Sequence, residues 1–279
     1  MITRSSKARA LYVERPLADG HPDIEARALC VKQSVESSRL GLTVDTLLKL
    51  IGRAVRVPIG QKTAAIVGCG PLPATVKRFA ELGWDCVGIE PVDEFTSSAR
   101  EYLGRDDAIL KGCAEELPLA DCSQTIVFME NVLEHVDSPL RSLGEAYRVL
   151  APGGVLYVTT TNRLRVTNGE YTIPFYQWLP RLVKESYIHQ HLHFKPKLAR
   201  YSSRPAVHWF SYADLCDLGR TAGFHRFYSR LDLSSNSDSE VRRGRLRRAA
   251  VSLARYNPWL RSLALTQIGG NIFMLKRRD

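Results

Sequence analysis

Between residues 63 and 160, short runs of β-branched and apolar residues alternate with stretches of helical periodicity. The runs at 64–67, 86–89, 108–110, 125–128 and 155–158 are typical of strands, and the helical patterns cover 74–82, 95–103 and 140–150. Strands that alternate with helices form parallel sheets covered on both faces. This pattern predicts an α/β fold in which ligands bind beyond the carboxyl ends of the strands.

The first predicted strand runs directly into Gly68-Cys69-Gly70, and a helical pattern follows from residue 74. Glycines permit positive φ and let a ligand approach the backbone closely. About twenty residues further on, Glu90 ends the second strand, where its carboxylate is placed to accept hydrogen bonds from ribose hydroxyls. Two glycines alone are also typical of a plain tight turn. The strand, turn, helix, strand and acid together favour a nucleoside ligand.

Four segments resemble, in the same order, the motifs of class I (Rossmann-like) S-adenosylmethionine-dependent methyltransferases. They are 66–70, 112–118, 131–136 and 147–154. Residues 170–175 with 178–180 also resemble a signature of bacterial members from small-molecule, secondary-metabolite and glycan pathways. The resemblance implies a seven-stranded, mostly parallel Rossmann-like sheet, which ends in an antiparallel pair at 227–233 and 271–275.

The same resemblance implies that S-adenosyl-L-methionine is bound and S-adenosyl-L-homocysteine is released. The implied cofactor-binding residues are Gly68, Cys69, Gly70, Glu90, Cys113, Ala114, Glu115, Glu130 and Asn131. In this assignment the glycine turn, Glu130 and Asn131 lie along the methionine part, and Glu90 holds the ribose diol. Because a thiol is a poor acceptor for the adenine amino group, Glu115 or a backbone carbonyl is expected to serve in place of Cys113.

The chain is predicted to divide into four parts. Residues 1–60 form an N-terminal helical extension, 61–162 the cofactor-binding core, 163–210 an insertion after strand five, and 211–279 the end of the sheet with a basic helical insertion. The third part is too long for a bare connection and is rich in aromatic residues, so it is interpreted as a substrate-binding cap or as a satellite core. Ser211 and Asp214 predict a capping box at the start of the next helix.

Methyl transfer requires a base only when the acceptor must lose a proton. The candidates are His135, Tyr171, His189, His191 and His208. A histidine near its ordinary pKa suits this task. His189, His191 and His193 also have the spacing of a metal site. No acid lies nearby and two lysines follow, so no metal is predicted.

The net charge of +10 is concentrated in the second part of the chain. Residues 1–162 carry 18 basic and 21 acidic residues, whereas 163–279 carry 21 and 8. The arginines between 242 and 261 predict a basic amphipathic helix, which either packs with its arginines in water, rests weakly on an anionic membrane surface, or meets a nucleic-acid backbone. Nucleic acid is disfavoured because no RNA-binding module is apparent.

The leading hypothesis is a methyltransferase that acts on an oxygen or nitrogen of a small molecule. The aromatic residues of the insertion at 163–210 favour it. The alternatives are an RNA or protein methyltransferase that uses the basic half, and a catalytically silent nucleotide-binding scaffold. The scaffold is suggested by Leu72, Cys113 and Thr125, which depart from the family pattern. No apolar run is long enough to span a bilayer and no signal sequence is apparent, so a cytoplasmic location is expected. The six cysteines include no CxxC pair, which disfavours a zinc knuckle.

Overall fold

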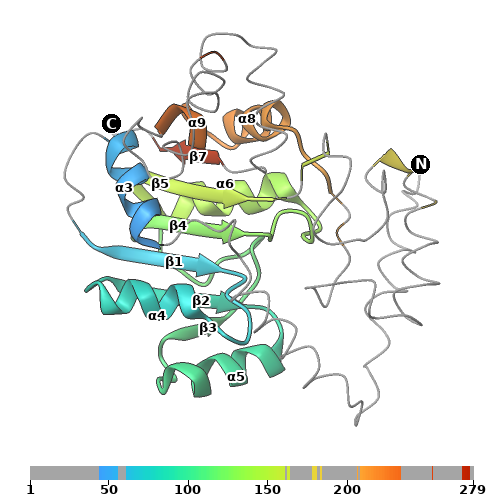
Figure 1. Cartoon of the computed structure of the whole chain (residues 1–279). Helices are drawn as coiled ribbons and strands as arrows, with labels where there is room; N and C mark the ends of the chain where they lie inside the picture. Colours follow the sequence, from blue (N-terminus) through green and yellow to red (C-terminus); the bar gives the residue numbers. More distant parts are fainter. Residues whose placement is uncertain are drawn as a thin grey trace.

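The computed structural model describes residues 44–55, 61–160, 162–163, 178–180, 183, 206, 208–233, 253 and 272–276. Within them, a seven-stranded sheet has the order β3-β2-β1-β4-β5-β7-β6 (Figure 1). Its strands are β1 Thr63–Val67, β2 Asp85–Glu90, β3 Ile109–Lys111, β4 Gln124–Glu130, β5 Leu150–Thr159, β6 Arg226–Ser229 and β7 Ile272–Leu275. The first five run parallel, and β7 is antiparallel to both of its neighbours, β5 and β6. The predicted α/β fold is confirmed.

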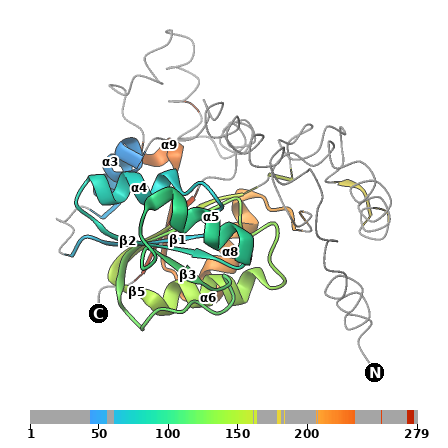
Figure 2. The same ribbon diagram turned by 90° about the horizontal axis from the view of Figure 1, so that it is seen from below.

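Helices cover both faces of the sheet (Figure 2). They are α3 Val44–Val55, α4 Ala74–Glu81, α5 Asp93–Leu103, α6 Pro139–Val149, α8 Tyr212–Thr221 and the short α9 Arg230–Leu233. Residues of α3 and α4 pack into one apolar cluster with the sheet, and residues of α6 and α8 pack into the other. Parallel strands need this double cover because both of their faces are apolar.

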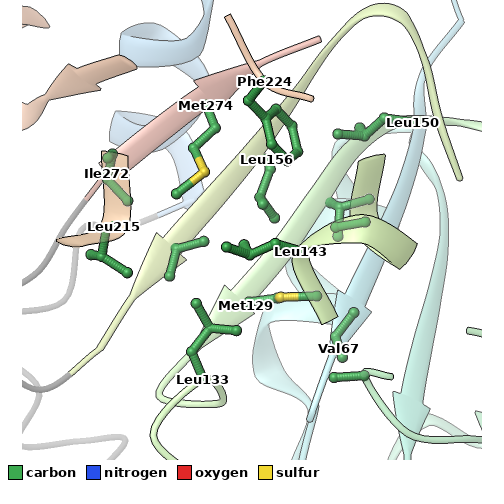
Figure 3. Close-up of a cluster of buried hydrophobic side chains, with 14 of the residues drawn as sticks. Val67, Met129, Leu133, Leu143, Leu150, Leu156, Leu215, Phe224, Ile272 and Met274 are labelled. Atoms are coloured by element: carbon green, nitrogen blue, oxygen red, sulfur yellow. The ribbon is translucent and has the colours of Figure 1, made fainter. Parts of the chain in front are cut away.

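The cluster beneath α6 and α8 is built from one face of five strands. Leu143 of α6 and Leu215 of α8 belong to this cluster together with Val67, Met129 and Leu156 (Figure 3). Each of these side chains is at most 2% exposed. Burial of a side chain of this size contributes about 1.5–3 kcal/mol, so this interface fixes the strands whose carboxyl ends form the site.

On the opposite face, aromatic rings from neighbouring elements form a continuous row. The centroid of Phe128 lies 6.0 Å from that of Phe79 and 4.6 Å from that of Tyr157. Tyr157 in turn lies 4.9 Å from Phe273 on β7. Ring pairs at such separations add stability beyond the area that they bury, so the row ties α4, β4, β5 and β7 together.

Two predicted boundaries were wrong. The sixth strand, predicted at 227–233, ends at Ser229, because the Asp232 carboxylate accepts the Ser229 backbone N–H and hydroxyl, both at 2.7 Å, and starts the helical turn α9. The fifth strand begins at Leu150 rather than 155 and includes the turn residue Gly153, whose φ is +78°. Gln124 pairs with Leu150 there, with a register shift before the next pair.

The predicted capping box is confirmed at the start of α8. The Ser211 hydroxyl accepts the N–H of Asp214 at 3.2 Å, and the Asp214 carboxylate accepts the N–H of Ser211 at 2.7 Å. Before the sheet, α3 lies within the predicted N-terminal helical extension of residues 1–60. Residues 1–43 and 56–60 lie outside the described residues. In the described part of the chain, no helix combines the length and apolar character needed to cross a membrane.

Candidate functional site

The glycine turn lies at the carboxyl end of β1, the middle strand of the parallel part of the sheet. Gly68 and Gly70 have φ of +66° and +68°, in the left-handed region that side chains disfavour. The N–H groups of Gly68 and Cys69 donate to the carbonyl of Ile89, at 2.8 and 3.3 Å. A Cβ on Gly68 would come within 2.7 Å of the Val132 side chain, whereas a Cβ on Gly70 would meet nothing within 4 Å. The turn is therefore open at Gly70.

Glu90 is tied to this turn from the end of β2. Its carboxylate accepts the N–H of Gly70 at 2.9 Å and that of Val92 at 3.2 Å, and its side chain is buried. Its backbone carbonyl accepts the Thr96 hydroxyl at 3.2 Å and the N–H of Gly112 at 3.3 Å. A carboxylate oxygen can accept more than one hydrogen bond. Glu90 therefore joins the turn, α5 and the loop after β3, and it presents an acceptor suited to hydroxyl groups.

The Cys69 side chain is partly buried and packs against the apolar cluster that contains residues of α3 and α4. Burial, and secondarily the negative charge of Glu90, raise the pKa of its thiol to about 12. A thiol with that pKa is neutral at physiological pH and is a poor nucleophile. The predicted contact of Cys69 with a ligand therefore rests on its backbone alone.

The loop after β3 carries the predicted adenine-binding residues. Cys113 is exposed and pairs with Glu116 in an isolated bridge, and Ala114 is buried. The Glu115 carboxylate faces the start of α6, where one oxygen accepts the N–H of Asp137 at 2.8 Å. It also accepts the N–H of Ser138 at 3.4 Å. Glu115 thus holds the loop against α6, and its predicted contact with adenine stays a prediction.

Glu130 ends β4, on the other side of β1. Because Val67 pairs with Met129, Gly68 follows β1 directly beside Glu130. The Glu130 side chain is half-buried, and among the described residues its carboxylate forms no hydrogen bond or ion pair. Burial raises its pKa to about 7. The next residue, Asn131, has a φ of +52°, and its N–H donates to the carbonyl of Thr159 at 2.9 Å.

The segment after Asn131 brings two base candidates to the same edge of the sheet. The carbonyl of Glu134 accepts the backbone N–H of His208 at 3.2 Å, so His208 lies beside the segment that contains His135. Both histidines are partly exposed. The His208 ring stacks on Phe210, with centroids 6.1 Å apart. The other candidates, Tyr171, His189 and His191, lie outside the described residues, as do His193 and nearly all of the basic segment 242–261.

Two residues that support the segments around the site, Glu134 and Arg148, were not predicted from the sequence. Glu134 is fully buried, and its carboxylate accepts the Thr160 hydroxyl at 2.8 Å. Arg148 donates to the carbonyls of Leu117 at 3.0 Å and Leu119 at 2.9 Å, and so fixes the end of the predicted adenine loop. The only available signal was that Glu134 and Arg148 lie inside the segments 131–136 and 147–154.

No group of three or more His, Cys, Asp or Glu side chains within the described residues could hold a metal ion. The histidines at 189, 191 and 193 are not among those residues, so the expectation of no metal stays a prediction.

Comparison with known proteins gives one family. Residues 66–158 match the model of the family described as "Methyltransferase domain". An uncharacterized methyltransferase of Mycobacterium bovis is 34% identical over 105 residues, which are 37% of this chain and 41% of that protein. A second from the same organism is 35% identical over 107 residues, covering 38% and 43%. The match thus spans about two fifths of the length of these relatives.

Among solved structures, the plantazolicin methyltransferase BamL, in complex with triazolic desmethylPZN analog and SAH, has a TM-score of 0.54 at 14% identity. The alignment covers 93% of this chain and 92% of that one. At this identity the likeness concerns the fold alone.

Proposed function

We propose that this chain, whose core is a class I S-adenosylmethionine-dependent methyltransferase domain, transfers a methyl group from that cofactor to an oxygen or nitrogen of a small molecule. The strongest support is the position of Glu90, whose buried carboxylate is bonded to Gly70 N–H at 2.9 Å across the end of β1. This contact places an acceptor for hydroxyl groups beside a turn that is open to a ligand.

The residues present fit a nucleoside cofactor. Glu90 would hold the ribose diol, Gly70 leaves space for a close approach to the backbone, and the loop at Cys113 and Ala114 would border the base. When bound, S-adenosylmethionine supplies a methyl group on a positively charged sulfur. The protein contributes alignment and exclusion of water, and alignment alone can lower the barrier of a two-reactant step by about 7–11 kcal/mol.

The acceptor is proposed to enter near the ends of β4 and β5. His135 and His208 lie at this edge and are partly exposed, and either could accept the proton of a hydroxyl acceptor. The aromatic segment 163–210 follows β5 directly, so it begins at the same edge. We propose that it contacts an acceptor with aromatic or anionic character.

Calorimetric titration with S-adenosylmethionine and S-adenosylhomocysteine tests the cofactor assignment. Glu90→Gln removes the charge that the ribose hydroxyls would meet, and should weaken both ligands by tenfold or more, since a hydrogen bond to a charged group contributes about 1.5–3 kcal/mol. Glu101→Gln, an exposed residue on α5, is the matched control and should bind as the wild type does. If neither ligand binds the wild type, the proposal is wrong.

The acceptor class requires a separate measurement. Formation of S-adenosylhomocysteine is followed with panels of phenols, sugars, amines and carboxylic acids, and in parallel with bulk RNA and a protein extract. Turnover with a small molecule alone supports the proposal. Turnover confined to RNA or protein would overturn the small-molecule assignment, and tight cofactor binding with no turnover on any panel would favour a silent scaffold.

A further inference from the structure

Two carboxylates flank the end of β1 and differ in how they are held. β1 ends in Ile66 and Val67 and contributes no charge of its own. On the β2 side, Glu90 is fixed by two backbone N–H groups. On the β4 side, Glu130 is half-buried and forms no hydrogen bond or ion pair with any other described residue. A half-buried carboxylate without partners is costly unless a ligand supplies the opposite charge.

The order of the strands indicates which part of the cofactor would lie beside Glu130. This step rests on the proposed function. Along the edge, the strands follow one another as β3, β2, β1, β4. In the proposed assignment the base lies at the loop after β3 and the ribose lies at Glu90, the end of β2. The 5′ substituent of the ribose then extends past Gly68, at the end of β1, toward β4. In S-adenosylmethionine that substituent is a sulfonium, and in the product it is a neutral sulfide.

We propose that Glu130 is the residue by which the site distinguishes the cationic methyl donor from its neutral product. The positive sulfur favours the carboxylate form of Glu130, and the carboxylate in turn strengthens binding of the donor. After methyl transfer this attraction is lost, which weakens the hold on the product at that point. Donor binding is thereby coupled to release of a proton, whereas product binding is not.

The charged and titratable groups around Glu130 leave it poised for this role. Tyr157 of β5 and Arg230 at the start of α9 lie on its face, Cys69 and Glu90 lie across β1, and Glu134 and His135 follow β4. Burial, and then the charge of Glu130, raise the pKa of Tyr157 far above its ordinary value, so this phenol stays neutral. The pKa of Glu130 itself is about 7 because of burial.

The sign of the pH effect follows from that value. Below pH 7 the unliganded site carries a proton that the donor must displace, and above pH 7 it does not. With a pKa of about 7, and with the carboxylate form binding the donor about tenfold more tightly than the protonated form, donor affinity should rise about fivefold between pH 6 and pH 8. Product affinity should change less than about twofold over the same range.

The experiment is calorimetry of both ligands on the full chain at pH 6, 7 and 8, in two buffers of different ionisation enthalpy. Wild-type protein should release about half a proton per donor bound at pH 7. Glu130→Gln should abolish that release, weaken the donor about tenfold at pH 8, and leave the product unchanged, which also shows that the variant is folded. Glu130→Asp should restore the pH dependence, and Glu101→Gln should match the wild type.

The difference in proton release between the wild type and Glu130→Gln reports on Glu130 alone, because any contribution from the ligand's own amino group or from His135 is present in both proteins. If both ligands bind the wild type but Glu130→Gln leaves the donor's pH profile intact, or weakens both ligands equally, the role of Glu130 is refuted and the cofactor assignment stands. If neither ligand binds the wild type, the proposed function fails first.

Discussion

Gly68 and Gly70 share a left-handed backbone but differ in the space around them, which permits a controlled substitution. Their φ angles are +66° and +68°. Alanine in this region costs about 1–2 kcal/mol at either position. At Gly68 the new methyl would also lie 2.7 Å from the Val132 Cγ2 atom. Overpacking of this kind costs a further 1–3 kcal/mol or so.

The free energy of unfolding should therefore fall by about 2–5 kcal/mol in Gly68→Ala and by about 1–2 kcal/mol in Gly70→Ala. Urea denaturation at equilibrium measures both values, provided that the m-value is unchanged. In a Val132→Ala background the clash is absent, so the cost of Gly68→Ala should drop to that of Gly70→Ala.

Gly70→Ala, the less destabilised of the two variants, should nevertheless show a clear loss of ligand affinity. The methyl of Gly70→Ala projects into the open space of the turn, so S-adenosylmethionine should bind more weakly to a protein that has lost only about 1–2 kcal/mol of stability. Equal destabilisation by the two substitutions, or no rescue of Gly68→Ala by Val132→Ala, would refute the idea that contact with Val132 sets the two glycines apart.

Three further outcomes follow from contacts around α6 and α8. Arg148→Ala should free the carbonyl of Leu119 and speed amide exchange in residues 117–121. It should also lower the free energy of unfolding by about 2 kcal/mol, because hydrogen bonds to a charged group are lost. Unchanged amide exchange in residues 117–121 would contradict the role of Arg148. Its partner Glu145 has a pKa held below 4.5, chiefly by the Arg148 hydrogen bond. Its contribution is therefore present above pH 4.5 and lost as the pH falls through the lowered value, so Glu145→Gln should flatten the acid limb of the stability curve. Ser211→Ala should cost about 1 kcal/mol in thermal or urea unfolding, while Ser98→Ala on the exposed face of α5 should cost less; equal losses would argue against the capping box formed with Asp214.

The sequence was sufficient wherever a local pattern determines structure. The first four strands and the helices between them were predicted to within a few residues, and Glu90 was placed at the end of its strand, because β-branched runs, glycine turns and helical spacing act locally. The sixth strand was predicted too long, since the apolar pattern through Leu233 continues past the Ser229–Asp232 cap that turns the chain into α9.

In the site, too, the sequence predicts the positions that local patterns determine but not the contacts between residues that are distant in the sequence. The glycine turn and Glu90 are near each other by fold class, so their contact was foreseeable. The bond between Glu134 and the backbone of His208 joins residues distant in the sequence, and no spacing indicates it. Likewise, the packing of α6 brings the N–H of Asp137 to the Glu115 carboxylate. Whether Glu130 has a partner among the described residues depends on which groups surround it in three dimensions.

β7 lies between β5 and β6 in the sheet, although a long segment of the chain joins β6 to β7. Ser229, at the end of β6, pairs directly with Ile272, at the start of β7. Two antiparallel strands that meet in this way can be joined by a turn of a few residues, and loop-closure entropy grows only slowly with length. The pairing of β6 with β7 therefore does not depend on how many residues join them. The number of residues between Leu233 and Ile272 can change while the strands that carry Glu90 and Glu130 keep their register.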